Sequence, residues 1–133
     1  MPAYTPDELV EVLYPQLGGL RYTPCKFTST DWDGDAKNAN QLIDLSVAFG
    51  MPSGIVPRVV HVILLFRDET VAIWAALVRD STDLSRGISQ YTQVANQYIS
   101  IGGNVECDEN GDIYWAQAEE MDNVVIRILG YWS

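Results

Sequence analysis

Positive charge is scarce in this sequence. Eight Lys and Arg residues stand against 18 Asp and Glu residues, which gives a formal net charge of −10 at pH 7. Proteins that bind nucleic acid rely largely on Lys and Arg to neutralise phosphate groups. The charge balance therefore argues against a nucleic-acid partner.

Long hydrophobic runs are also lacking. No apolar segment approaches the roughly 18–20 residues that a transmembrane helix needs. Residues 1–8 lack the basic region and hydrophobic core of a signal peptide. We therefore expect neither membrane insertion nor export by a signal peptide.

Cysteine and histidine are rare, with two and one residues in the chain. Cys25 and Cys107 are far apart, and each lies in or beside an apparent strand. Two reduced, partly buried thiols are the simpler interpretation, and a disulfide is the alternative. His61 lies in the most apolar segment, where a lone histidine is more often a core or interface residue than a catalytic base.

No catalytic constellation is evident. There is no nucleophile-elbow sequence, and neither cysteine has a histidine nearby that would activate it. Carboxylate pairs such as Glu106 with Asp112, or Glu119 with Glu120, are the pairs that a glycosidase would need. Among 18 acidic residues such pairs are expected by coincidence. We therefore predict no catalytic residue and no enzyme activity.

Two acidic segments resemble the start of a calcium-binding loop without completing one. Acidic residues alternate in Asp31–Asp35, but Leu42 occupies the position of the bidentate Glu. Asp108–Asp112 alternates similarly, but Ile113 stands where the loop needs Gly. We expect a polar loop and a hairpin with solvated carboxylates, with no metal or cofactor. Adventitious calcium binding is the alternative.

One helix is predicted near the N-terminus. Thr5–Glu8 has the pattern of a capping box with Pro at the first helical position. Leu9, Leu13 and Leu17 follow at helical spacing. A helix this short is marginal alone in water, so its apolar stripe must pack on something. It either covers one end of its own sheet or docks onto a neighbouring subunit.

The remaining chain predicts strands. All six prolines fall before residue 58, so later segments can run through sheet interiors without losing backbone donors. Two segments, 59–66 and 71–78, are expected to form a central hairpin, the first covered on both faces. Asn110-Gly111 predicts a tight hairpin turn with positive φ at both residues. Further strands are expected at 20–28, 42–49, 88–101 with irregular stretches, and 123–132 as an integral part of a sheet, with a polar loop at 28–40.

Short strands with frequent turns and no repeated βαβ pattern predict a mainly β protein. The best architecture is an antiparallel β-sandwich, jelly-roll-like, with the short N-terminal α-helix. With 133 residues, of which 47% are hydrophobic, the chain has material for one core and not for two.

Four segments together resemble a module of tailed-bacteriophage virion proteins, which include head fibres, tail fibres and capsid decoration proteins. The segments are Asp31–Lys37, Ile43–Gly54, Asp108–Trp115 and Ile126–Trp132. The resemblance implies a β-sandwich, often oligomeric, that is displayed on a virion for stabilisation or host contact.

The resemblance covers 31–132 and divides the chain. Residues 31–133 would form the β-sandwich domain, and residues 1–30 would form a helix and arm, with docking as one role. The protein would be made in the host cytoplasm and become part of the virion. A homo-oligomer, with a trimer favoured, and contact with a major capsid or tail protein are the partners expected.

Aromatic residues supply the candidate contact sites. Trp32 lies in the predicted polar loop, and Tyr131 and Trp132 end the last strand on opposite faces. Each is either buried or exposed to stack on a sugar or anchor a subunit interface. Arg127 alternates with apolar neighbours, so it faces solvent or pairs with a carboxylate of an adjoining subunit. The alternative function is a lectin-like domain that recognises host surface glycans.

Overall fold

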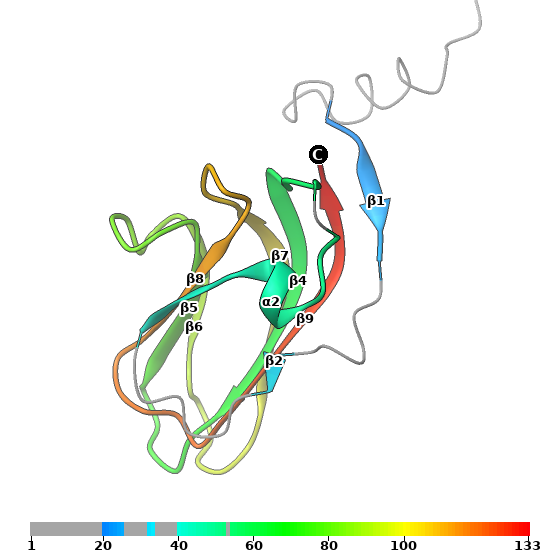
Figure 1. The fold of residues 1–133 in the computed structure, drawn as a ribbon. Coiled ribbons are helices and arrows are strands. Elements are labelled where there is room, and N and C mark those ends of the chain that lie inside the picture. Colours follow the sequence, from blue (N-terminus) through cyan, green and yellow to red (C-terminus); the bar gives the residue numbers. More distant parts are fainter. Residues whose placement is uncertain (1–19, 26–31, 34–39, 53) are drawn as a thin grey trace, which may run out of the picture.

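The computed structural model describes residues 20–25, 32–33, 40–52 and 54–133. The predicted helix with Leu9, Leu13 and Leu17 lies outside the described residues. The described chain is mainly β and forms two antiparallel sheets that pack face to face (Figure 1). The prediction of an antiparallel β-sandwich is confirmed.

The larger sheet, sheet A, has five strands. They are β1 (Tyr22–Pro24), β9 (Asn123–Trp132), β4 (Val59–Arg67) and β7 (Ile99–Glu106) in that spatial order, with β2 (Trp32–Asp33) also paired to β9. Sheet B has four strands. They are β3 (Gln41–Ile43), β8 (Ile113–Gln117), β5 (Trp74–Val78) and β6 (Gly87–Tyr91).

The strand pairing is nested. Setting aside the short β2, the first strand pairs with the last, β1 with β9; β3 then pairs with β8, β4 with β7, and β5 with β6. A long antiparallel ribbon that wraps in this way into two sheets is a jelly roll. The topology thus bears out the jelly-roll-like fold that the sequence predicts.

Alternation along the strands builds the core. In β4, Val60, Val62, Leu64 and Phe66 are fully buried, and the residues between them are only half-buried. Successive side chains of a strand point to opposite faces, so this strand is covered on one face. The prediction that it is covered on both faces is therefore wrong within the described structure. Across the sandwich, Trp115 of β8 is fully buried in the same core.

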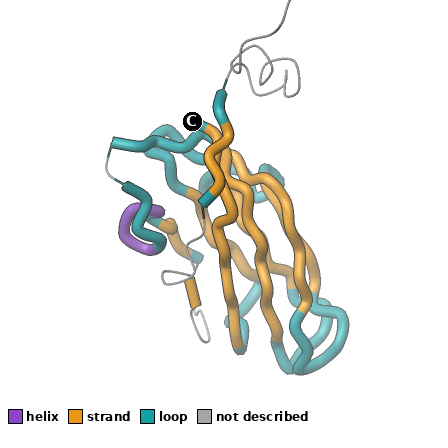
Figure 2. Tube along the Cα trace, turned by 90° about the vertical axis from the view of Figure 1, so that its right-hand side faces the viewer, coloured by secondary structure: helices purple, strands orange, loops and turns teal. Residues whose placement is uncertain are grey.

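Residues 42–49 do not form the predicted strand. β3 ends at Ile43, and a one-turn helix, α2 (Leu45–Ala48), follows; Figure 2 shows it beside the strands. Asp44 caps this turn, because its carboxylate accepts hydrogen bonds from the backbone N–H groups of Ser46 at 3.0 Å and Val47 at 3.4 Å. The alternation holds for Ile43 and Leu45, which are buried, but it fails at Val47, which is 81% exposed because Asp44 caps a helical turn here.

The predicted hairpin of residues 59–66 with 71–78 is also wrong. β4 belongs to sheet A and β5 to sheet B, and the connection between them crosses the sandwich. Thr92 braces this crossing: its hydroxyl donates to the carbonyl of Thr70 at 2.8 Å and accepts from the N–H of Ile73 at 3.0 Å. A short polar connection is equally compatible with a hairpin and with a crossing, so local sequence could not separate them.

The turn at Asn110-Gly111 likewise joins different sheets, since β7 lies in sheet A and β8 in sheet B. Of the two turn residues, Gly111 has a positive φ, of 83°, and Asn110 does not. The N–H of Gly111 donates to the carbonyl of Asp108 at 3.0 Å. A Cβ at Gly111 would lie 2.8 Å from Pro57, so this position excludes larger residues both by conformation and by space. The prediction of a turn is confirmed and that of a two-residue hairpin is wrong.

Other expectations hold in part. Residues 88–101 contain strands β6 and β7 separated by an irregular stretch, as predicted, and β9 lies inside sheet A. β1 falls within the segment expected to be an arm, yet its pairing with β9 makes it part of the sandwich. Trp32 lies in β2 and not in a loop, with its Cα opposite Ile126.

Candidate functional site

Tyr131 and Trp132 lie on opposite faces of β9, as the alternation predicts. Tyr131 points into the core and Trp132 points outward, yet each side chain is only 7% exposed. Trp132 is covered by Tyr22 of the edge strand β1, whose ring centroid lies 4.6 Å from that of the indole. Of the two interpretations offered for these residues, burial is the one that the structure supports.

Tyr22 closes this corner of sheet A. Its ring lies over Gly130, where an added Cβ would come within 2.1 Å of the hydroxyl. The hydroxyl also donates to the carbonyl of Leu129 at 3.3 Å and lies 3.4 Å from Nδ1 of His61. His61 is therefore half-buried against an aromatic side chain, which fits the structural role expected for a lone histidine.

Arg127 is exposed on the outer face of β9, opposite Ile63 of β4. It is thus on the surface, as one of its two predicted environments requires. The Trp32 side chain lies outside what the structure describes. Of the three predicted contact residues whose side chains are described, Tyr131 lies in the core and Arg127 is exposed on the outer face, so these residues do not converge on one site.

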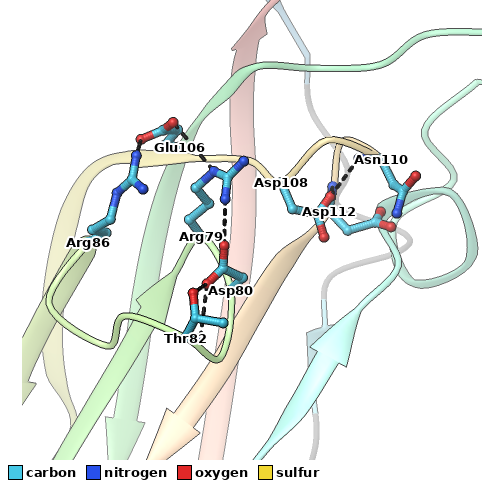
Figure 3. Close-up of polar contacts among 8 residues, drawn as sticks. All are labelled: Arg79, Asp80, Thr82, Arg86, Glu106, Asp108, Asn110 and Asp112. Atoms are coloured by element: carbon cyan, nitrogen blue, oxygen red, sulfur yellow. Dashed lines mark hydrogen bonds and ion pairs between the residues drawn. The ribbon is translucent and has the colours of Figure 1, made fainter.

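Charged side chains gather at one end of the sandwich (Figure 3). Glu106 of β7 receives Arg86 at 2.6 Å and Arg79 at 3.4 Å, both from the connection that follows β5. Arg79 also meets Asp80 at 2.5 Å. A hydrogen bond from the hydroxyl of Thr82 is the first of several contacts that lower the pKa of Asp80. The network links sheet A to sheet B, and its cations are already engaged by carboxylates.

The second acidic segment is used to shape its own loop. One carboxylate oxygen of Asp108 accepts hydrogen bonds from the N–H groups of Asn110 and Asp112, each at 2.9 Å. Asp112 in turn accepts from the N–H of Leu45 at 3.0 Å, and burial raises the pKa of its carboxyl group. These carboxylates are structural caps, as Figure 3 illustrates. Within the described residues, no three His, Cys, Asp or Glu side chains are grouped to hold a metal ion.

Cys25 and Cys107 are not paired with each other in the structure; Cys107 is buried and Cys25 is half-buried. Burial, helped by the negative charges of Asp108, Asp112 and Glu106, raises the pKa of Cys107 to about 12. Burial raises the pKa of Cys25 as well. A thiol with a raised pKa is a poor nucleophile at neutral pH, because the thiolate is the reactive form.

Sheet B differs from the rest of the molecule in having no charge. Although 20% of the chain is charged, none of the residues in β3, β5, β6 and β8 is Asp, Glu, Lys or Arg. Ala76, Val78 and Ala116 form a small buried cluster on its outer side, with Trp74 and Tyr114 packed against it. This outer surface is therefore neutral and largely apolar.

A groove opens on this surface over β5 and β6, with a volume of about 400 Å³. We call it the aromatic groove. It is lined by Trp74, Ala76, Leu84, Ser85, Ser89 and Tyr91. Trp74 and Tyr91 are direct cross-strand partners, and Tyr91 is 55% exposed. The sequence pattern did not predict this site, because Trp74 lies in a segment that was expected to form part of a central hairpin. The alternation that places Trp74 and Ala76 on one face of the strand was the signal that could have indicated it.

Sheet A has an outer surface of another kind, which we call the aliphatic face. It consists of the outward, half-buried side chains of Val59, Ile63, Leu65 and Val125. β4 and β9, which carry it, include Arg67 and Arg127 and no carboxylate. At one end Arg67 lies over the ring of Tyr98, with 5.4 Å between the guanidinium carbon and the ring centroid.

None of the described residues forms a helix long and apolar enough to cross a membrane. Comparisons with known protein families, with curated proteins and with solved structures found no match for this chain.

Proposed function

We propose that this chain is a structural protein of a tailed-bacteriophage virion, either a capsid decoration protein or a fibre subunit, and that it acts by binding and not by catalysis. The resemblance of its sequence motifs supports this proposal. So does the jelly-roll topology, which viral capsid proteins and lectins use. The support from topology is an analogy, because one fold hosts many functions.

The observation that carries an assembly role is the aliphatic face. Of the four outward side chains from Val59 to Leu65 on β4, three are aliphatic and His61 is the fourth. Such a composition is unusual for a surface that meets only water. Antiparallel sheets with one solvated face have polar residues at these positions. An apolar surface of this kind is typical of a protein–protein contact.

The distribution of charge favours a second copy of the chain as the occupant. Two molecules with a net charge of −10 repel each other unless they meet through surfaces that lack negative charge. β4 and β9 carry two arginines and no carboxylate, so a second copy would meet no negative charge on these two strands. Exposed carboxylates such as Glu69, Glu119 and Glu120 lie in the connections at one end of the sandwich.

Such complementarity favours a head-to-tail arrangement. The aliphatic face of one subunit, whose strands β4 and β9 carry no carboxylate, would meet a different, acidic surface on the next. Contacts between two different surfaces are heterologous and form a ring when the rotation between subunits closes, whereas a two-fold dimer joins a surface to itself. The proposal is therefore a cyclic oligomer, with a trimer as the favoured state.

Light scattering on the purified chain tests the assembly role. We expect the mass of a closed oligomer for the wild-type chain and of a monomer for Leu65→Glu, because Glu would place a buried charge in the contact. Val47→Glu is the matched control: Val47 is 81% exposed on α2, away from sheet A, so this variant should keep the wild-type mass. A monomeric wild type at all concentrations would contradict assembly through this face.

The virion assignment has its own test. An antibody against the chain should detect it in phage particles banded on a density gradient from the source culture. Its presence in the soluble fraction and absence from every particle band would contradict the assignment.

A second candidate function, recognition of host surface glycans, is favoured by one observation. The aromatic groove offers an exposed tyrosine ring and a partly buried indole beside hydroxyl groups on an uncharged surface. Two of the four residues first considered for this role, Tyr131 and Trp132, are buried, so the groove is the better-supported place for a glycan.

A further inference from the structure

We propose that the aromatic groove binds a neutral pyranose sugar, held by Trp74 and Tyr91. The inference deepens the glycan-recognition function above and rests on it. It does not depend on assembly through the aliphatic face, which lies on the other sheet.

The two aromatic residues are placed to receive a flat ligand. Trp74 of β5 and Tyr91 of β6 are direct antiparallel partners, so both side chains emerge on the same face from neighbouring strands. Ala76, two residues along β5, also lines the groove; it is only 1% exposed, and Trp74 packs against the cluster that it forms with Val78 and Ala116. Tyr91 presents the exposed ring, and Trp74 extends the aromatic surface beside it.

A pyranose matches this surface chemically. One face of the sugar ring presents several C–H groups and is weakly apolar, while its edge carries hydroxyl groups. Aromatic rings have a negative face that attracts such C–H groups. Tyr and Trp also offer an apolar body with a polar tip, which suits a ligand that is apolar on one side and hydroxylated at its rim.

Hydroxyl groups at the edge of the groove supply the polar contacts. In the part of the chain that the structure describes, the side chain of Ser89 makes no hydrogen bond and is exposed. The hydroxyl of Ser85 donates to Asp83 at 2.5 Å, which leaves its oxygen available to accept from a sugar hydroxyl. Small-molecule sites combine an apolar lining with a few polar groups in this way.

Charge restricts the ligand to a neutral one. All six residues that line the groove are uncharged. The nearest cation in sequence, Arg86, is held by Glu106 at 2.6 Å. An acidic sugar would have no counter-ion among the lining residues and would be repelled by a protein of net charge −10.

The alternative occupant is a second copy of the chain. Aromatic side chains can anchor a protein contact as well, but the core of such a contact is typically completed by further apolar side chains. The groove instead combines two aromatic rings with two serine hydroxyls, and the largest of its exposed side chains is Tyr91. This combination favours the sugar.

NMR titration of the full chain tests the proposal. The probes are cellotriose, lactose and N,N′,N″-triacetylchitotriose as neutral sugars, and trigalacturonic acid as the charged comparison. We expect at least one neutral sugar to shift the indole N–H signal of Trp74 and the backbone signals of Ser89 and Tyr91. Trigalacturonic acid should shift none of them.

Variants separate stacking from folding. Tyr91→Ala should raise the dissociation constant about tenfold, the size expected when one aromatic contact is lost. If this variant fails to fold, Tyr91→Leu takes its place: it keeps the apolar volume without the aromatic plane and should weaken binding similarly. Tyr98→Ala is the matched control, because Tyr98 is 48% exposed but belongs to the Arg67 contact next to sheet A.

Three results would overturn the proposal. One is the absence of shifts at the groove with every neutral sugar while the chain is folded. Another is tighter binding of trigalacturonic acid than of the neutral sugars. The third is a change of the groove signals with protein concentration alone, which would identify the groove as a contact between copies. A monomeric mass in light scattering contradicts only the assembly role, so the two failures are distinguishable.

Discussion

The two outer faces of this sandwich are built from different apolar side chains. Sheet A presents half-buried aliphatic residues such as Ile63 and Leu65, on strands whose only charged side chains are arginines. Sheet B presents Trp74 and Tyr91 with serine hydroxyls, on strands that have no charge at all. In the two proposals above, the aliphatic face meets another protein and the aromatic groove takes a small flat ligand, so each face has its own test.

A contrast between the inside and the outside of sheet B should give the largest effect. Trp115→Ala removes a fully buried side chain and should lower the free energy of unfolding by about 3–5 kcal/mol. Trp74→Ala, on the half-exposed outer side, should lower it by only about 1 kcal/mol. Denaturant titrations measure both. Equal losses would mean that Trp74 is a core residue, and the aromatic groove would lose its main contact.

The closed corner of sheet A gives the next effect. Gly130→Ala places a methyl group against the ring of Tyr22 and should cost about 1–3 kcal/mol of unfolding free energy. Gly102→Ala, on the outer side of β7, is the control, because its nearest contact would be an ordinary 3.7 Å.

Combining Gly130→Ala with Tyr22→Ala identifies the clash as the cause. The double variant should lose less stability than the sum of the single variants, because the contact is absent once Tyr22 is removed. Additive losses would show that Tyr22 does not cover this corner of the face.

The charged link between the sheets should have a smaller effect. Glu106→Gln removes the carboxylate that meets Arg86 and Arg79, and it should cost about 0.5–1 kcal/mol at low salt and less at high salt. Glu119→Gln, at an exposed carboxylate outside this network, should change little. A loss that does not depend on salt would show that Glu106 acts by packing and not by charge.

The smallest effect concerns pH. Burial raises the pKa of Asp112 above its ordinary value of 3.8, so the folded chain holds this proton more tightly than the unfolded chain. The stabilisation is present below the ordinary pKa and is lost as the pH rises through the raised pKa. Asp112→Asn can still accept from the N–H of Leu45 and should abolish this part of the pH dependence. Urea titrations at several pH values measure it; an unchanged profile would contradict the assignment to Asp112.

Local patterns predicted much of the architecture. Apolar runs and β-branched residues located β4, β5 and β9, and the Asn110-Gly111 turn was correctly placed. The alternation of residues 42–49 was wrongly assigned to a strand, because one turn of helix capped by Asp44 has similar spacing over so short a segment. Turn residues show where the chain reverses and not whether it returns to the same sheet.

The candidate sites were harder to predict, because exposure depends on what covers a residue. Trp132 lies at the end of a strand and points outward, yet Tyr22, 110 positions earlier, covers it. Trp74 lies in a segment of apolar residues, yet its cross-strand partner Tyr91, on the edge strand β6, remains 55% exposed. Sequence spacing carries no information about such distant coverage.

The sequence by itself determined that this chain is a β protein, since a two-residue period is a local property of side chains along a strand. It also determined that the protein is acidic, with few cations to bind phosphate. Only the tertiary structure decided that β1 meets β9 and that β4 and β5 lie in different sheets. Pairing of distant strands depends on burying both inner faces in a single core, and that choice separated the aliphatic face from the aromatic groove.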